Sequence, residues 1–514
     1  MKVHLLFAAD DAEQTAELPE HQADLRRDLD LDSVVEAMAN DDAVVRDVCL
    51  RCLLADSVGI ADVRYRQAIL TDLLAHPQQA RALYQVASGA ADVKRRIRTG
   101  LYSRDQPSWI LRSAISILTE LTTSLKSLRE FSRANRETFT SAGLRQLLSV
   151  IDRDLDDEYL SVLDDHLRRL KFPSGVHLTA RLGPGALGTD YVLRRPVTVR
   201  NWLQTQWDRA ARRDTYVYRL APRDEAGGRV LSWLEDQGIN LVADAAAQST
   251  DHIIDYFARL RWELAFYIGC INLRDRLGET AMSCLPDPDT AASATLEARG
   301  LVDTALALRT SVPPVPNDLD AMGRSLVMIT GANQGGKSTF MRALGLAQLM
   351  MQAGCFVTAH SFRASVSSGV FTHFRREEDA SMTHGKLDEE LDRMSALIDM
   401  ITPHAMLLCN ESFACTNERE GSQIALEIVN TLNEHKTRII YVTHMYALAK
   451  RLADQRTDTA VFLRAGRMDD GRRTFELKPG IPQTTSHGRD LYDQVFGTGR
   501  GLTSSSTAFE ESQR

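Results

Sequence analysis

Apolar residues recur three and four positions apart through much of the first third of the chain. The stretches 64–77 (RYRQAILTDLLAHP) and 116–139 (SILTELTTSLKSLREFSRANRETF) show this spacing. It brings the apolar side chains onto one face of an α-helix, where they pack against a core. We therefore predict that residues from about 30 to 170 form one helix after another.

The pattern changes at Pro173 and Gly175. In residues 175–200 (GVHLTARLGPGALGTDYVLRRPVTVR), alternating positions around a Gly-Pro turn predict a small strand-rich insertion. Helical spacing returns in residues 249–277 (STDHIIDYFARLRWELAFYIGCINLRDRL). A group of prolines then indicates a linker region; they are Pro286, Pro288, Pro313, Pro314 and Pro316.

Beyond these prolines, short apolar segments alternate with helical ones. The apolar segments are SLVMIT (325–330), GVFTHF (369–374), AMLLCN (405–410), RIIYVTH (438–444) and AVFLRA (460–465). Strands that alternate with helices are typical of a mostly parallel sheet covered by helices. The predicted fold class is multidomain: an all-α region with a small strand-rich insertion, followed by an α/β domain.

Composition limits the classes of protein that the chain resembles. With 514 residues it is too long for a single hydrophobic core. The net charge of −8 gives no global basic field, although one local basic patch is enough to contact nucleic-acid phosphates. No apolar run is long enough to span a bilayer and the start is unlike a secretory signal, so no membrane partner is expected.

The seven cysteines show no disulfide framework, which indicates reduced thiols in a cytoplasmic protein. Cys49 and Cys52 form a CxxC pattern within residues 44–58 (VVRDVCLRCLLADSV). The helical spacing of this stretch favours two buried thiols on one helix face. A metal or redox site is the alternative, and no second Cys or His pair lies nearby in the sequence.

Residues 331–338 (GANQGGKS) satisfy the phosphate-loop pattern GxxxxGK[ST] between a predicted strand and a predicted helix. The glycines let backbone N–H groups turn toward phosphates, and the helix N-terminus adds positive potential. Lys337 is expected to reach the β- and γ-phosphates, and Ser338 to ligate Mg²⁺. The expected nucleotide-binding residues are Gly331, Ala332, Asn333, Gln334, Gly335, Gly336, Lys337, Ser338 and Thr339.

Two other predicted strands end in polar residues. Glu411 follows the segment 405–410 and is placed to position the attacking water. His444 ends the segment 438–444, where an imidazole can contact the γ-phosphate; a polar strand end without a catalytic role is the alternative. Lys337, Glu411 and His444 are therefore the catalytic candidates. Asn410 stands where nucleotide-hydrolysing folds normally carry the Asp that helps to hold Mg²⁺.

The region from about 300 to 496 resembles the ATPase domain of the MutS mismatch-repair family. The matching segments are PVPNDL (314–319), MITGANQGGKSTFMR (328–342), NESFACTNEREGS (410–422), VTHMYAL (442–448) and TFELKPGIPQTTSHGRDLY (474–492). They include Asn333, Thr416 and Gly421, which match the family's pattern. The preceding helical part resembles the family's core and lever domains. The resemblance implies a phosphate-loop (ABC-type) ATPase domain, ATP and Mg²⁺ as cofactors, a homodimer, and DNA as a partner.

The chain departs from the family's pattern in three respects. Nothing in it resembles the family's N-terminal mismatch-reading and connector domains, or the C-terminal nuclease-type domain of one branch, so we expect it to lack them. Asn410 replaces the family's Asp and keeps an oxygen acceptor but loses a negative charge. Weaker Mg²⁺ binding and slow hydrolysis are the expected result, with Asn410 and Ser338 as the metal ligands.

The segment 374–391 (FRREEDASMTHGKLDEEL) corresponds to the family's stretch that reaches the partner subunit's nucleotide. The family's Ser-Gly-Arg-Ser pattern is not kept, and Ser381 and Thr383 are both candidates for the hydroxyl group. A solvated acidic helix face is the alternative interpretation of the residues in this stretch.

Arginines gather in the insertion, where the family's architecture has a DNA-gripping clamp. With Trp202 and Trp207 between them, they are candidates for sequence-independent phosphate contacts. An ordinary charged surface with inward-packed tryptophans is the alternative. The candidate DNA-contacting residues are Arg194, Arg195, Arg200, Arg209, Arg212 and Arg213.

The expected domains follow from these patterns. They are a helical core- and lever-like domain (1–175), a clamp-like insertion (176–240), a returning lever helix with linker (241–305), an ATPase domain (306–496) and a disordered tail (497–514). The leading hypothesis is a MutS-like ATPase whose nucleotide state drives clamp-like changes on mismatched, branched or otherwise unusual DNA. The alternative is a nucleotide-gated protein scaffold with negligible hydrolysis and no DNA binding.

Overall fold

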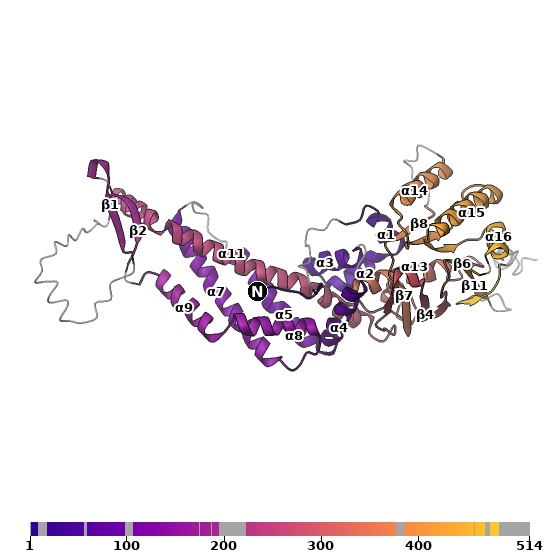
Figure 1. Cartoon of the computed structure of the whole chain (residues 1–514), viewed down its shortest axis with the longest axis horizontal. Coiled ribbons are helices and arrows are strands. Elements are labelled where there is room, and N and C mark those ends of the chain that lie inside the picture. Colours follow the sequence, from indigo (N-terminus) through magenta and orange to yellow (C-terminus); the bar gives the residue numbers. More distant parts are fainter. Residues whose placement is uncertain are drawn as a thin grey trace, which may run out of the picture. The chain divides into compact units, whose positions relative to one another are not determined.

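The chain divides into two compact units (Figure 1). The first contains the described residues of 75–265 together with 2–5, and the second contains the other described residues. The computed structural model describes residues 2–8, 18–55, 59–97, 106–173, 175–186, 188–194, 221, 223–376, 385–456, 458–467 and 473–482. The predicted tail 497–514 lies outside these residues.

The first unit is mainly helical, as the spacing of apolar residues predicts. Its central helix α7 contacts α5, α8 and α9 through leucines on one face, among them Leu121, Leu125 and Leu128. The Oγ of Ser132 on α7 donates a hydrogen bond to the carbonyl of Leu148 on α8 at 3.0 Å. The helices are α5 (Pro77–Ala91), α6 (Val93–Ile97), α7 (Pro107–Ala134), α8 (Ala142–Asp154), α9 (Asp157–Leu170) and the part of α11 (Glu225–Leu277) up to Ala265.

The alternating segment after Pro173 forms two antiparallel strands, β1 (Leu178–Leu182) and β2 (Gly188–Leu193). A short 3₁₀ turn, η1 (Pro184–Ala186), lies between them, so both the strands and the turn are confirmed. The helix α11 begins at Glu225, within the range expected for the insertion.

The second unit begins with four helices: α1 (Gln22–Asp28), α2 (Leu31–Ala39), α3 (Ala43–Leu53) and α4 (Ile60–Ala75), the last ending at the boundary between the units. Asp42 caps α3, because its side chain accepts hydrogen bonds from the N–H groups of Val44 and Val45. The helix α3 contacts α13 (Lys337–Ala353), which places this N-terminal part with the sheets rather than with α5 to α9.

The thiols of the CxxC pattern are buried on α3. Burial raises the pKa of Cys49 well above its ordinary value. A second pair lies in the same unit, since the Sγ atoms of Cys270 and Cys355 are 3.5 Å apart. Among the described residues, no group of three or more His, Cys, Asp or Glu is arranged to hold a metal ion.

A six-stranded sheet forms the centre of the second unit, in the order β12-β11-β6-β10-β9-β8. All neighbours are parallel except β12 and β11. Its strands are β6 (Leu326–Thr330), β8 (Val370–Phe374), β9 (Met406–Asn410), β10 (Arg438–Val442), β11 (Ala460–Arg467) and β12 (Arg473–Pro479). The five strands predicted from apolar segments are therefore confirmed, and together with the helical first unit they confirm a mostly helical, multidomain chain with an α/β part.

Helices α14 (Lys386–Met400), α15 (Glu418–Glu434) and α16 (Tyr446–Gln455) cover one side of this sheet (Figure 1). Met394, Val429 and Leu448 from these helices share a buried core with Leu407 and Tyr441 of the strands. The helix α13 contacts β8, β9 and β10 and also strands of a second sheet.

The second sheet has four strands in the order β3-β7-β4-β5. They are β3 (Asp287–Asp289), β7 (Ser361–Ser365), β4 (Leu296–Leu301) and β5 (Asn317–Asp320), with η2 (Ala291–Ser293) and α12 (Thr304–Arg309) in the connections. Because β6, β8, β9 and β10 are parallel, their carboxyl ends meet at one edge of the six-stranded sheet. In such sheets ligands bind at this edge.

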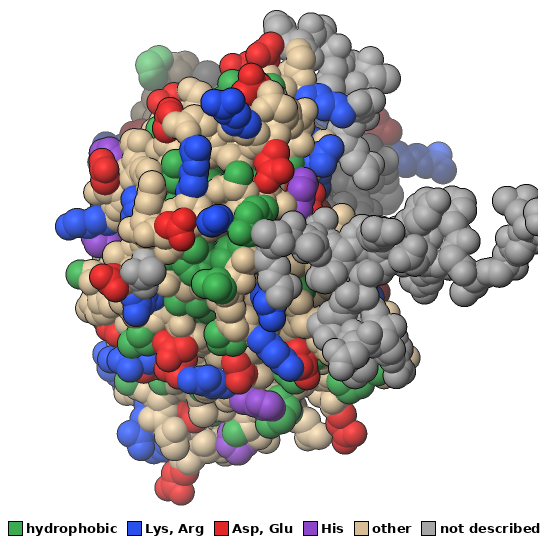
Figure 2. Space-filling model, turned by 90° about the vertical axis from the view of Figure 1, so that its right-hand side faces the viewer, with side chains coloured by type: hydrophobic (Ala, Val, Ile, Leu, Met, Phe, Trp, Pro, Cys, Tyr) green, Lys and Arg blue, Asp and Glu red, His purple; other side chains and the backbone are tan. Residues whose placement is uncertain are grey.

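In the part of the chain that the structure describes, no helix combines the length and hydropathy needed to span a bilayer. Figure 2 shows a face on which Lys and Arg side chains are interspersed with Asp and Glu, around a smaller hydrophobic area. This face therefore presents no broad basic surface.

Candidate nucleotide-binding site

The loop 331–336 connects β6 to α13 and requires its glycines for steric reasons. Gly331 and Gly336 have φ of 119° and 88°, a region that other residues rarely adopt. A Cβ on Gly335 would lie only 2.8 Å from the Cβ of Ala465 on β11. The loop is thus held against β11, and the first residues of α13 line an open pocket. Helix N-termini in such positions bind anions.

Lys337 lies buried across this loop. Its Nζ donates hydrogen bonds to the carbonyl oxygens of Gly331 and Ala332, both at 2.9 Å. Burial lowers the pKa of Lys337, and the nearby Glu411 carboxylate opposes that effect. The ammonium group is therefore already held at the loop, with carbonyl partners that a phosphate can replace.

Ser338 and Asn410 meet across two elements. The Ser338 Oγ on α13 donates a hydrogen bond to the Asn410 Oδ1 at the end of β9, at 2.9 Å. The pairing of Asn410 with Phe374 of β8 and Val442 of β10 fixes its position in the sheet. A hydroxyl and an amide oxygen are hard ligands, so this donor set fits Mg²⁺, although neither group brings a negative charge.

Glu411 follows Asn410 and adopts a left-handed backbone conformation with φ of 56°. Its Oε1 lies 3.8 Å from the Nδ1 of His444, and its Oε2 lies 4.0 Å from an Nη1 of Arg375. These are ion-pair rather than hydrogen-bond distances. The neighbouring His444, with Lys337 and Arg375, holds the pKa of Glu411 below its ordinary value against the effect of burial. Glu411 is therefore ionised at neutral pH.

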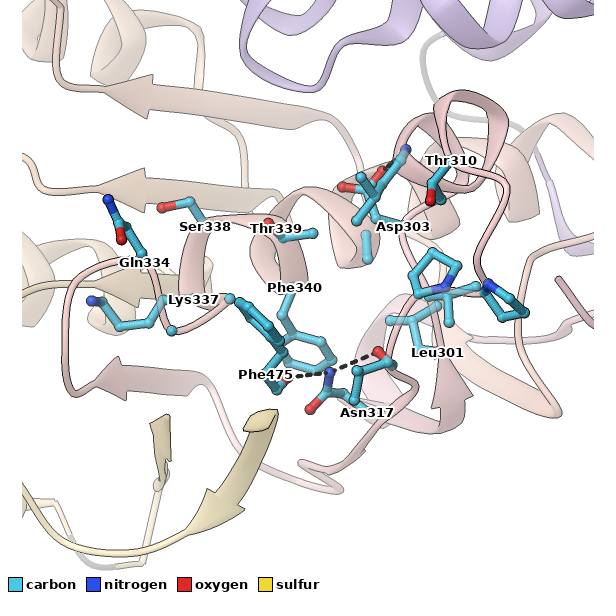
Figure 3. Close-up of a pocket in the computed structure, with 18 of the residues that line it drawn as sticks. Leu301, Asp303, Thr310, Asn317, Gln334, Lys337, Ser338, Thr339, Phe340 and Phe475 are labelled. Carbon is cyan, nitrogen blue, oxygen red and sulfur yellow. Dashed lines mark hydrogen bonds between the residues drawn. The ribbon is translucent and has the colours of Figure 1, made fainter. Parts of the chain in front are cut away.

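A pocket of about 550 Å³ brings the loop, Lys337, Ser338, Thr339 and Glu411 together. Figure 3 shows Lys337, Ser338 and Thr339 at the start of α13, with Phe475 and Asn317 beside them. The remaining wall contains the polar residues Asp303, Thr310 and Asn317 but is otherwise apolar, and its apolar part comes mainly from the segment before β5. The apolar members are Leu301, Val302, Leu306, Val312, Pro313, Pro314, Val315, Phe340, Ala343 and Phe475.

Phe475 is a pocket residue that the sequence patterns do not single out. Its side chain is 48% exposed and its φ is 58°. The Nδ2 of Asn317 donates to the Phe475 carbonyl at 3.2 Å (Figure 3). The Oδ1 of Asn317 accepts from the N–H of Leu477 at 2.6 Å. Asn317 therefore ties β12 to the pocket wall and holds an aromatic ring beside the phosphate-loop segment.

Two family profiles match the chain, one before and one after the proline-rich linker at 286–316. The MutS2 N-terminal domain matches residues 59–280, and MutS domain V matches residues 327–488. The second range contains the loop 331–336, Asn410, Glu411 and His444. The chain belongs to the MutS family.

Several MutS-family relatives carry names of mismatch-repair proteins. The DNA mismatch repair protein MutS of Chloroflexus aurantiacus is 28% identical over 267 residues, which cover 47% of this chain and 27% of that protein. MutS of Thermus aquaticus is 31% identical over 134 residues (26% and 16%), and the probable Msh6 of Drosophila melanogaster is 34% identical over 137 residues (26% and 12%). The matches therefore span little more than a quarter of these relatives' own lengths at most.

The structure brings most of the expected MutS-type site residues together. Asn333, Gln334, Gly335, Gly336 and Thr339 line the pocket with Lys337, Ser338 and Glu411, whereas Gly331 and Ala332 form the loop behind Lys337. His444 does not line the pocket and contacts it through Glu411.

Other candidates lie beyond what the structure describes. Of the clamp arginines only Arg194 is described, and its Nε donates to the Oγ1 of Thr179 at 3.0 Å. The other five arginines lie outside the described residues, as do Ser381 and Thr383.

Proposed function

We propose that this MutS-family protein binds and hydrolyses ATP at the pocket beside α13. One observation carries the proposal: Lys337, Ser338 and Glu411 line the same pocket, and Asn410 is bonded to Ser338. A cationic loop lysine, oxygen ligands for a cation and an ionised carboxylate are the parts that phosphoryl-transfer sites require. The match of MutS domain V to residues 327–488 supports an ATPase domain at about 306–496.

Each residue of the pocket has a separate role in hydrolysis, which follows from its position. Backbone N–H groups of residues 331–336 and of the first turn of α13 bind the β- and γ-phosphates, and Lys337 exchanges its carbonyl partners for phosphate oxygens. Mg²⁺, held through Ser338 and Asn410, would neutralise charge on the phosphoryl oxygens. Glu411 orients the attacking water, and His444 beside it lowers the pKa of that carboxylate.

The apolar wall suits the base of the nucleotide. Phe475 offers a half-exposed aromatic ring, and Val312, Pro313 and Pro314 add further apolar surface. A planar heterocycle gains free energy by stacking on such a ring. We therefore assign the phosphates to the α13 side of the pocket and the base to the Phe475 side.

DNA and a second copy of the chain are the proposed partners. Relatives named DNA mismatch repair proteins support DNA, and mismatched, branched or otherwise unusual structures are the proposed targets. A two-fold dimer through the ATPase domain uses the same surface twice. Sedimentation that shows only monomer at micromolar concentration with ATP bound would contradict the dimer.

The direct test measures ATP turnover with and without homoduplex, mismatched and branched DNA. Stimulation by one DNA class, lost in Lys337→Ala, is the expected result. A nucleotide-gated scaffold is the second candidate, favoured by the missing negative charge at Asn410. Tight ATP binding with no turnover on any DNA, and no DNA binding, would support the scaffold instead.

A further inference from the structure

A buried carboxyl group on α14 contacts the turn that carries Glu411. Glu390 is only 5% exposed, and its Oε2 accepts a hydrogen bond from the N–H of Phe413 at 2.7 Å. The Sγ of Cys415 lies 3.4 Å from the same oxygen and donates to it. The Glu390 carboxylate on α14 therefore accepts hydrogen bonds from two residues of the segment that follows Glu411, Phe413 and Cys415.

The backbone of this turn adopts an unfavourable conformation. Glu411 and Phe413 have φ of 56° and 62°, left-handed values that non-glycine residues hold only when their surroundings impose them. A Cβ on Gly421 would lie 2.3 Å from the Phe413 carbonyl oxygen, so the turn is pressed against α15. The conformation that points Glu411 into the pocket thus depends on its neighbours.

Further hydrogen bonds tie the same turn and α14 to the sheet. The Ser412 Oγ donates to the carbonyl of His373 on β8 at 2.7 Å, and the Tyr441 hydroxyl donates to the carbonyl of Ser412 at 2.8 Å. The Nε2 of His373 lies 3.1 Å from the carbonyl oxygen of Glu390 and donates to it. Glu390 is therefore anchored to β8 through its backbone and to the Glu411 turn through its side chain.

We propose that Glu390 is a positioning residue that fixes the direction of Glu411 through the Phe413 N–H group. The inference rests on the proposed function, because it assigns Glu390 a role in the same hydrolysis. A displacement of α14 breaks this hydrogen bond and frees the strained turn.

The test compares two substitutions of similar size. Glu390→Gln keeps a carbonyl oxygen for the Phe413 N–H, whereas Glu390→Met fills the space without an acceptor. We expect Glu390→Met to lower turnover at saturating ATP by about 10- to 100-fold and Glu390→Gln by less than about threefold, as loss of a buried hydrogen bond predicts. ATP affinity should remain within about threefold in both variants. Asp392→Asn, an exposed residue of α14, is the matched control and should leave turnover unchanged.

A second comparison separates positioning from general loss of structure. In a Glu411→Gln background, Glu390→Met should change the residual turnover less than about twofold, because it acts through Glu411. The same large loss in both backgrounds would overturn the inference, as would equal turnover in the Gln and Met variants. If Glu390→Met does not fold, Glu390→Asp takes its place, since its shorter side chain withdraws the acceptor.

Amide hydrogen exchange distinguishes failure of the inference from failure of the proposed function. If the wild type shows no turnover, the proposed function fails, and exchange at the Phe413 N–H decides the inference separately. Faster exchange in Glu390→Met than in Glu390→Gln supports it. Equal protection in wild type and both variants overturns it.

Discussion

Replacing Asn410 by Asp tests whether this residue helps to hold a cation. The substitution preserves the shape of the side chain and adds one negative charge. The Oδ1 of Asn410 already accepts the hydrogen bond of the Ser338 Oγ at 2.9 Å, and an aspartate oxygen retains that bond. The change therefore isolates charge at the site where the resemblance to the MutS family implies an Asp.

The size of the effect follows from this distance. Mg²⁺ bonds oxygen at about 2.1 Å. An ion bound to the Ser338 Oγ therefore lies within about 5 Å of the Asn410 Oδ1, because these two oxygens are 2.9 Å apart. At an effective dielectric constant of about 20, a charge pair of +2 and −1 at about 5 Å gains about 7 kcal/mol. Desolvation of the new carboxylate and repulsion by Glu411 offset most of this gain. We expect about 2 kcal/mol to remain, which is about 30-fold in Mg²⁺ affinity.

The assay is a Mg²⁺ titration of ATP turnover in wild type and Asn410→Asp. Half-saturation is expected at about 30-fold lower Mg²⁺ in the variant, with a higher maximal rate. Asn430→Asp is the control for added charge, because Asn430 binds Arg456 and does not line the pocket. An unchanged or weaker Mg²⁺ requirement in Asn410→Asp, with ATP binding intact, would refute the assignment of Asn410 to the cation site.

Three further predictions follow from other contacts of the second unit. Lys337→Met should weaken ATP binding by about 100-fold or more. The melting temperature of the nucleotide-free protein should stay unchanged or rise, because the substitution removes a buried ammonium group whose hydrogen bonds go to the carbonyl oxygens of Gly331 and Ala332. Equal ATP affinity in calorimetry would contradict this. Phe475→Ala should weaken ATP binding by about 1–3 kcal/mol and leave the binding of inorganic triphosphate almost unchanged. An equal loss for both ligands would contradict the assignment of the nucleotide base to the Phe475 side of the pocket. Burial lowers the pKa of His373 to about 4. Between about pH 6.5 and 4 the unfolded chain therefore binds a proton that the folded protein does not. The free energy of unfolding should fall by up to about 3 kcal/mol as the pH falls through this window. Denaturant unfolding of His373→Asn should lack this contribution, and parallel pH profiles of variant and wild type would argue against a neutral buried imidazole.

Local patterns were sufficient for much of this fold. The strands β6 and β10 are buried along their whole length, so their apolar runs identify them without tertiary information. Lys337 and Ser338 are predictable because the phosphate-loop pattern lies between a strand and a helix. Helical spacing likewise identifies α7, whose leucines form one buried face.

Contacts between distant segments were not predictable in this way. Phe475 reaches the pocket only because β12 pairs with β11 and Asn317 holds it there. Glu390 belongs to a run of acidic residues that is typical of a solvated helix face, yet Asp388 is exposed and Glu390 is buried. The grouping of α1 to α4 with the sheets also escapes the sequence, because helical spacing shows which face is buried but not what covers it.

ATP binding and single-turnover hydrolysis, measured side by side in wild type, Lys337→Ala and Glu411→Gln, test the central claim most directly. Glu411 lies in the pocket with its carboxylate ionised, whereas Lys337 supplies the cation for the phosphates. We predict that wild type binds and hydrolyses ATP, Glu411→Gln binds ATP but hydrolyses it at least about 100-fold more slowly, and Lys337→Ala does neither. Equal hydrolysis in all three proteins, or tight binding by all three without hydrolysis, would contradict an ATPase site built on these residues.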